Sequence, residues 1–152
     1  MTNVSMAQRK IIEKLQSYFH QKASRFGVEV VFLYGSWAVG FPRLDSDIDL
    51  AILFDDEGIP EGQLFERLTA ITMDLIQSFS CEVSAIPIHR DFRKPMLYYN
   101  AIVKGIPVFF TDRRRYIALM NEALYHMEDF KTFGRKWLMD LATRNLEEIS
   151  RA

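Results

Sequence analysis

The sequence predicts an α/β (α+β) fold in which helices flank a mixed sheet of about four strands. Short runs of β-branched and aromatic residues alternate with longer segments whose apolar residues recur at helical spacing, and glycine- or proline-containing turns separate them. The chain has 152 residues, of which 49% are hydrophobic and 26% charged, as expected of one globular domain with a core. We therefore expect residues 1–152 to form a single domain, with a core at about 28–110 and a helical tail at about 112–150.

The first half of the chain predicts two helices separated by two strands. Apolar residues recur at helical spacing over residues 11–26, and Gly27 follows where a helix would end. The runs VEVVFLY, residues 28–34, and IDLAILF, residues 48–54, are short and apolar throughout, which is typical of buried strands. A turn-rich loop, DDEGIPEG, then precedes a second helix in which apolar residues are spaced at helical intervals over residues 64–75.

The second half predicts two more strands and a helical tail. The strands are CEVSAIPI, residues 81–88, and IPVFF, residues 106–110; between them PMLYYNAIVK, residues 95–104, opens with a proline suited to a first helical turn. From Asp112 onward the pattern is helical, and Gly134 is expected to divide the tail into two helices. Core packing is expected for the aromatic residues of the tail, which are Tyr116, Tyr125, Phe130, Phe133 and Trp137.

Charge and composition exclude several classes of function. Lys and Arg number 19 against 20 Asp and Glu, so a net charge of −1 supplies no general field for binding nucleic acid. No apolar run approaches the roughly 20 residues of a membrane span, and the N-terminus lacks the apolar core of a signal peptide. Cys81, the only cysteine, lies in an apolar stretch where a buried thiol is expected. We expect a cytoplasmic protein with no membrane partner.

The stretch YGSWAVGFPRLDSDIDLAILF, residues 34–54, carries the candidate chemistry. Asp47 and Asp49 have the two-residue period of a strand, so their side chains leave the same face and repel each other unless a proton or a bound cation compensates the charge. Upstream, Gly35 lets the backbone approach a bound group, and Ser36 is a natural N-cap beside amides suited to a phosphate. The stretch therefore predicts a metal and a phosphate at one place.

A Gly-Ser pair, ten residues and then Asp-x-Asp resembles the signature of the DNA polymerase β-like nucleotidyltransferase superfamily, present here as GS WAVGFPRLDS DID. The resemblance implies the palm-like fold of that superfamily. It also implies that Gly35 and Ser36 grip a nucleoside triphosphate, while Asp47 and Asp49 hold Mg²⁺ ions in a two-metal site and act in catalysis. A third carboxylate on a later strand completes such sites. Glu82, which opens the strand after the second predicted helix, is our choice as a metal ligand and catalytic residue.

One departure from the family pattern concerns the phosphates. Family members often read GSRARG, whereas this chain has Trp37 and Val39 at the places of the two arginines. The positive charge for a triphosphate must then come from elsewhere. The candidates are Arg43, Lys104 and the run Arg113, Arg114 and Arg115.

The small size and helical tail of the chain resemble those of the minimal nucleotidyltransferase (MNT) antitoxins. That resemblance implies transfer of AMP from ATP to a tyrosine of a partner, a HEPN-family toxin, by an antitoxin of a toxin–antitoxin pair. The mixed aromatic and polar residues of the tail are of the kind that anchors a protein partner. Two alternatives stay open: transfer to RNA or a small molecule, and a degenerate module that binds a partner without chemistry.

Overall fold

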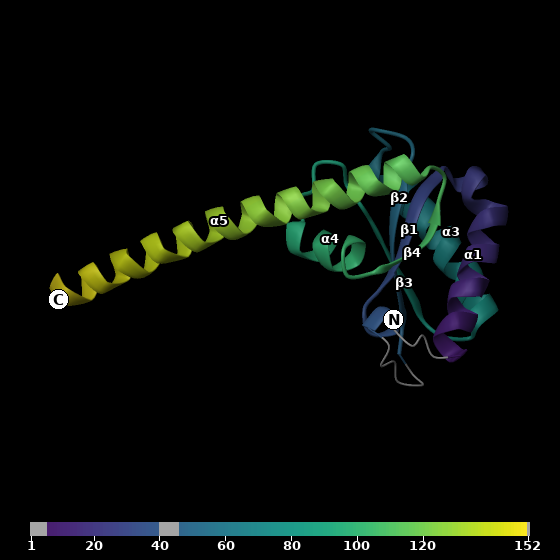
Figure 1. The fold of residues 1–152 in the computed structure, drawn as a ribbon, viewed down its shortest axis with the longest axis horizontal. Coiled ribbons are helices and arrows are strands. Elements are labelled where there is room, and N and C mark those ends of the chain that lie inside the picture. The colour runs from purple at the N-terminus through teal and green to yellow at the C-terminus, as the bar shows by residue number, and fades with distance from the viewer. Residues whose placement is uncertain (1–5, 40–45, 152) are drawn as a thin grey trace.

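The elements follow one another as the sequence predicts in the computed structural model, which describes residues 6–39 and 46–151 (Figure 1). In chain order they are α1 (Met6–Phe26), β1 (Val28–Tyr34), α2 (Ser36–Val39), β2 (Ile48–Phe54), α3 (Glu61–Phe79), β3 (Val83–Pro87), α4 (Pro95–Ile102), β4 (Ile106–Phe110) and α5 (Arg113–Arg151).

The described residues form a four-stranded sheet in the order β3-β2-β1-β4. β1 lies antiparallel to both β2 and β4, while β2 and β3 are parallel, with α3 as the crossover between them. The sheet is therefore mixed, as predicted. Its two edge strands, β3 and β4, contain Pro87 and Pro107.

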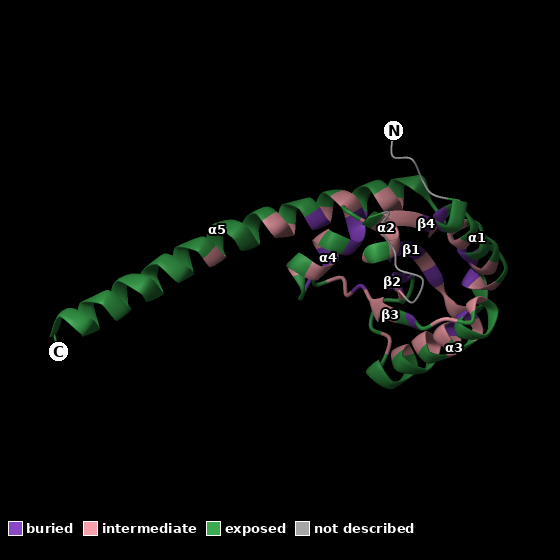
Figure 2. Ribbon diagram, turned by 90° about the horizontal axis from the view of Figure 1, so that it is seen from below, coloured by how far each residue is buried: buried purple, intermediate pink, exposed green. Residues whose placement is uncertain are grey.

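Helices cover both faces of the sheet, which explains why the central strands are apolar throughout (Figures 1 and 2). On one face, α1 and α3 pack against alternate residues of β1 and β2, such as Leu33 and Leu50. On the other face, α4 and the start of α5 pack against the intervening residues, such as Phe32 and Ala51. The first core includes Phe19 from α1, and the second includes Tyr98 from α4; both side chains are fully buried or nearly so.

The tail differs from its prediction in two ways. Gly134 does not divide it, because α5 is one continuous helix of 39 residues; a single glycine costs only about 1 kcal/mol relative to alanine in a helix interior. The predicted aromatic core is also wrong for most of its members. Tyr116 packs against the second core, but the other four are exposed: Tyr125 by 69%, Phe130 by 42%, Phe133 by 76% and Trp137 by 60%.

No helix within residues 6–39 and 46–151 is both long enough and apolar enough to cross a lipid bilayer.

Candidate active site

A sharp turn at Gly35 joins β1 to the short helix α2. Gly35 has a φ of 76°, a conformation that residues with a side chain rarely adopt. Its carbonyl accepts hydrogen bonds from the backbone N–H groups of Ala38 at 3.1 Å and Val39 at 3.2 Å. The preceding amides, those of Ser36 and Trp37, belong to the first helical turn, where no intrahelical acceptor exists. The residues that follow Gly35 thus form a single short helix.

The carboxylate of Asp49 lies directly against this turn. Asp49 pairs with Tyr34 across β2 and β1, and a Cβ atom built on Gly35 would lie 2.5 Å from Asp49 Oδ2. Any side chain at position 35 would therefore displace the carboxylate. Residues 14 positions apart in the sequence are brought together by the antiparallel pairing of the two strands.

Asp47 and Asp49 place two negative charges at the start of β2. Asp47 is exposed and precedes the strand, while Asp49 is half-buried. Partial burial raises the pKa of Asp49 above its usual value, and the charge of Asp47 raises it further. The pKa values of Tyr34 and Cys81 are also raised, first by burial and then by the charges of Asp49 and Asp47 respectively. The negative charge of the aspartate pair therefore also acts on Tyr34, at the end of β1, and on Cys81, shortly before β3.

The backbone of Glu82 lies beside the aspartate pair. Its carbonyl accepts a hydrogen bond of 2.9 Å from the N–H of Ile48, and its side chain is exposed. Within the parallel register it is Ser84, rather than Glu82, that pairs with Asp49. Among the residues that the structure describes, no group of three His, Cys, Asp or Glu side chains is gathered closely enough to hold a metal ion. Glu82 as the third carboxylate thus stays a prediction.

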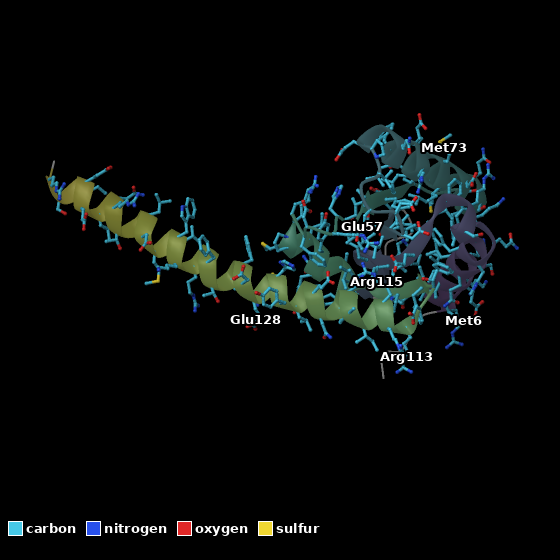
Figure 3. The ribbon with its side chains drawn as sticks, turned by 90° about the horizontal axis from the view of Figure 1, so that it is seen from above. Met6, Glu57, Met73, Arg113, Arg115 and Glu128 are labelled. Atoms are coloured by element: carbon cyan, nitrogen blue, oxygen red, sulfur yellow. The ribbon has the colours of Figure 1, made fainter. Side chains whose placement is uncertain are left out.

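The basic candidates for holding phosphate lie at different ends of the sheet. Arg115 pairs with Glu29 at 3.0 Å near the start of β1, whereas the aspartate pair lies beside the end of that strand. Arg113 and Arg115 lie at the start of α5 (Figure 3), and the Arg115–Glu29 pair puts this start at the opposite end of β1 from the aspartate pair. Lys104 lies toward the site's own end of the sheet, because it shortly precedes β4, whose first residue, Ile106, pairs with Leu33 near the end of β1. Arg43 lies outside the described residues.

Two residues that the sequence analysis did not predict hold the turn in place. The Nε1–H group of the Trp37 indole donates a hydrogen bond of 3.1 Å to the Ser46 carbonyl. This bond fixes the backbone directly before Asp47. The buried side chain of Gln8 in α1 donates to the Trp37 carbonyl at 2.7 Å. Trp37 thus stands where family members often have arginine and acts instead as a positioning residue. Gln8 is one of several polar residues in α1, and nothing in its sequence context distinguishes it.

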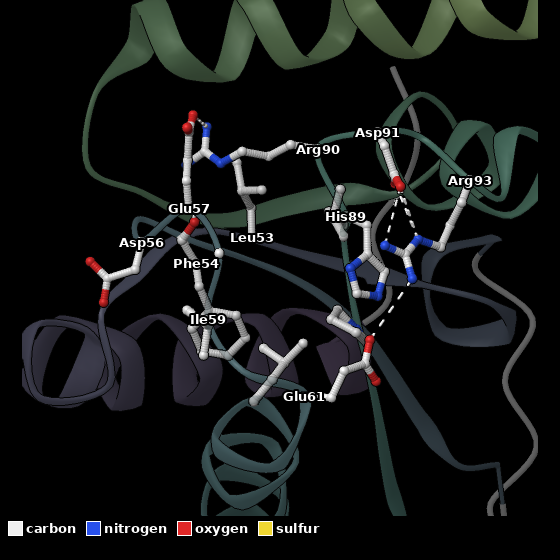
Figure 4. Close-up of a pocket in the computed structure, with 14 residues that line it drawn as sticks. Leu53, Phe54, Asp56, Glu57, Ile59, Glu61, His89, Arg90, Asp91 and Arg93 are labelled. Atoms are coloured by element: carbon white, nitrogen blue, oxygen red, sulfur yellow. Dashed lines mark hydrogen bonds and ion pairs between the residues drawn. The ribbon is translucent and has the colours of Figure 1, made fainter.

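A pocket lies at the far end of β2, away from the aspartate pair, and carries a different set of charges. This pocket, of about 360 Å³, is lined by Phe54, the loop that follows it and the segment after β3 (Figure 4). Arg93 pairs with Asp91 at 3.1 Å and with Glu61 at 3.9 Å, while Arg90 pairs with Glu57 at 3.8 Å. Its basic groups are therefore already neutralised by carboxylates of the protein.

The fold and the turn define a nucleotidyltransferase. The family model described as "Polymerase beta, Nucleotidyltransferase" matches residues 13–114, and the chain belongs to that family. None of the curated proteins compared is significantly similar to it in sequence.

Among solved structures, the fold is similar to that of chains in toxin–antitoxin complexes. One complex contains AMP-PNP; its matching chain has 14% identity and a TM-score of 0.65, with 84% of this chain and 98% of that chain covered. A chain of an MntA–HepT complex has 13% identity and a TM-score of 0.60, over 86% of this chain and 96% of that one. A complex of tri-AMPylated HEPN toxin with MNT antitoxin from Shewanella oneidensis gives 14% identity and a TM-score of 0.56, over 84% and 98%.

Proposed function

We propose that this chain is an MNT-type antitoxin that transfers AMP from ATP to a tyrosine hydroxyl of a HEPN-family toxin, in an Mg²⁺-dependent reaction. The observation that carries the proposal is the contact between the Asp49 carboxylate and the Gly35 turn, with Asp47 two residues earlier. Family membership supports nucleotidyl transfer. The similar structures, which include a complex with AMP-PNP and one that contains an AMPylated HEPN toxin, support the donor and the acceptor.

The aspartate pair has the chemistry that Mg²⁺ requires. Carboxylate and phosphate oxygens are the ligands that this ion prefers, and a bound cation would relieve the repulsion between Asp47 and Asp49, which adds to the effect of burial in raising the pKa of Asp49. When bound, the metal would neutralise charge on the phosphates and favour in-line displacement at phosphorus. Asp47 and Asp49 are the residues that would hold it, with Glu82 as the proposed third ligand.

The proposed reaction is a substitution at the α-phosphorus of ATP. The tyrosine oxygen forms a new bond to this phosphorus, while the bond to the oxygen that bridges to the β-phosphate breaks and pyrophosphate leaves. A tyrosine hydroxyl has a pKa of about 10, so its proton must pass to a base at neutral pH, and Glu82 is the proposed acceptor. Ser36 and the amides beside Gly35 would hold the β- and γ-phosphates, with Lys104 supplying positive charge.

The Asp47→Asn, Asp49→Asn double variant tests the assignment. We expect it to fold, because an amide replaces each carboxylate without loss of a core group and the mutual repulsion disappears. AMP transfer should fall below detection when the variant is co-expressed with the toxin encoded by the adjacent gene. Intact-mass spectrometry of the toxin would measure this, since the wild-type enzyme should make the toxin heavier by one or more AMP units.

Asp56→Asn is the matched control. Asp56 is exposed and pairs only at 3.5 Å with Arg67, so its loss should leave transfer unchanged. Transfer by the double variant equal to that of the wild type would contradict the proposal. An unmodified toxin together with labelled RNA would contradict the tyrosine acceptor while retaining the nucleotidyltransferase.

A binding module without chemistry is the second candidate, and two observations favour it. Trp37 occupies an arginine position and uses its indole N–H to hold the backbone, and a serine rather than a carboxylate pairs with Asp49 on β3. Titration calorimetry with Mg²⁺ and ATP separates the candidates. Binding that requires the metal, and that the double variant loses, supports the enzyme; no binding at millimolar ATP supports the module.

A further inference from the structure

Three side chains form a row across the sheet at the end that carries the candidate site. Asp49 on β2 pairs with Tyr34 on β1 and with Ser84 on β3, and paired residues of neighbouring strands point to the same face of a sheet. The next row on this face, two residues along each strand, belongs to the second core or packs against it; it consists of Phe32, Ala51 and Ile86. The row of Asp49 therefore lies on the face of the sheet against which α4 and α5 pack.

The two ends of this row differ in how far they are covered. Tyr34 is half-buried and packs against the second core, whereas Ser84 is exposed, although Val83 before it is buried. Ser84 is the only polar residue of β3, and its hydroxyl makes no hydrogen bond to any residue within the described parts of the chain. Asp49 is thus open to a ligand on the side of β3, where the Ser84 hydroxyl is available as a hydrogen-bond donor.

The direction of the proposed reaction assigns a role to this open side. Because the strand order is β3-β2-β1, the Gly35 turn at the end of β1 and Ser84 on β3 lie on opposite sides of Asp49. In the proposed reaction the turn holds the β- and γ-phosphates, so the leaving pyrophosphate lies on the side of β1. An in-line displacement at phosphorus requires the attacking oxygen to be opposite the leaving group. The acceptor hydroxyl must therefore approach from the side of β3.

We propose that Ser84 binds the acceptor hydroxyl and aims it at the α-phosphorus. The Ser84 Oγ–H donates a hydrogen bond to the acceptor oxygen, which leaves a lone pair of that oxygen directed at phosphorus. The acceptor proton passes to the proposed base, Glu82, two residues earlier in the chain. The hydrogen bond from Ser84 then stabilises the negative charge that the oxygen carries before its bond to phosphorus is complete. This role rests on the proposed function and adds to it a residue that contacts the acceptor.

Ser84→Ala tests the role in the full-length protein with the toxin encoded by the adjacent gene. At saturating Mg²⁺, ATP and toxin, kcat for AMP transfer should fall about tenfold or more, because the acceptor oxygen loses its orientation. A time course of intact toxin mass measures this rate. Titration calorimetry should give the wild-type dissociation constant for ATP in the presence of Mg²⁺, whereas a general distortion of the site would weaken ATP binding as well. Ser84→Thr keeps the hydroxyl and should restore most of the rate.

Ser78→Ala is the matched control, because Ser78 is also exposed but belongs to α3, which covers the opposite face of the sheet. Its kcat should equal that of the wild type. An unchanged kcat for Ser84→Ala, a loss of ATP binding by this variant, or a Ser84→Thr variant as slow as Ser84→Ala would each overturn the role of Ser84 while the wild type still transfers AMP. A wild type that transfers no AMP would instead overturn the proposed function, and the role of Ser84 with it.

Discussion

Gly35 shows how a single residue determines the geometry of the candidate site. Its positive φ lets β1 end in a turn, and its missing side chain leaves room for the Asp49 carboxylate. We predict that Gly35→Ala lowers the free energy of unfolding by about 1–3 kcal/mol, since it adds backbone strain to the clash. It should also abolish Mg²⁺-dependent ATP binding by moving Asp49.

Gly58→Ala is the control for backbone strain. Gly58 has a φ of 74°, almost the same as that of Gly35, but nothing lies within 4 Å of the added Cβ. Urea unfolding should show a loss of about 1 kcal/mol for this variant, and calorimetry should show unchanged ATP binding. Equal ATP binding by the two variants would show that the Gly35–Asp49 contact is not needed.

Lys104, in the turn between α4 and β4, is the basic candidate that lies toward the proposed triphosphate's end of the sheet. Gly105 beside it lies so close to β1 that an added Cβ would be 2.9 Å from the Leu33 carbonyl oxygen. We predict that Lys104→Met raises the KM for ATP about tenfold and leaves the stability unchanged, because the side chain is exposed. Lys94→Met, an equally exposed change before the other end of α4, should leave the KM as it is. The same KM for both variants would remove Lys104 from the site.

The sequence predicted the approach of Asp49 to the Gly35 turn, which depends on local geometry. Gly35 and Asp49 belong to one contiguous motif, and strand periodicity with antiparallel pairing brings them together. It did not predict Gln8 or the role of Trp37, because their hydrogen bonds join α1, α2 and the chain before β2. Such contacts are set by the packing of distant elements, which no local pattern records.

At the scale of elements, Glu29 connects three parts of the fold. Its carboxylate, with only 16% of the side chain exposed, pairs with Arg90 at 3.2 Å and with Arg115 at 3.0 Å. This joins β1 to the segment after β3 and to the start of α5. We predict that Glu29→Gln lowers the free energy of unfolding by about 1–3 kcal/mol, because Arg115 loses its counter-charge and Arg90 loses the nearer and more buried of its two carboxylate partners.

Glu57→Gln tests whether the burial of Glu29 accounts for the stability that its ion pairs provide. Glu57 also pairs with Arg90, at 3.8 Å, but 81% of its side chain is exposed. Its loss should change the free energy of unfolding by less than about 0.5 kcal/mol in the same urea titration. If the two variants were equally destabilised, the Glu29 pairs would have no special role.

The order of helices and strands was predictable because each has its own hydrophobic period. The tail was mispredicted for a related reason. Phe130 and Trp137 have the spacing of residues on one packed helix face. This spacing indicates that the face packs against something, but it does not indicate whether that is the same chain or another molecule. Gly134 was read as a break because glycine often ends helices, whereas here the residues on both sides continue the helix.

At the scale of the whole molecule, the last part of α5, Glu128–Arg151, and the candidate site lie on separate parts of the structure. The site is at one end of β1 and β2, and Glu128–Arg151 leaves the body beyond the residues of α5 that pack against α4 (Figure 1).

The prolines of the two edge strands restrict how this protein can assemble. An open sheet edge normally invites another strand, which is a common route to aggregates. Proline lacks the backbone N–H that such a strand would need as a donor. On β3, the N–H of Ile88 already donates to the Ile52 carbonyl within the sheet, which leaves Pro87 at the open edge; Pro107 interrupts the other edge strand, β4. Each open edge strand therefore has one position that cannot donate a hydrogen bond, which disfavours the addition of a further strand to this sheet.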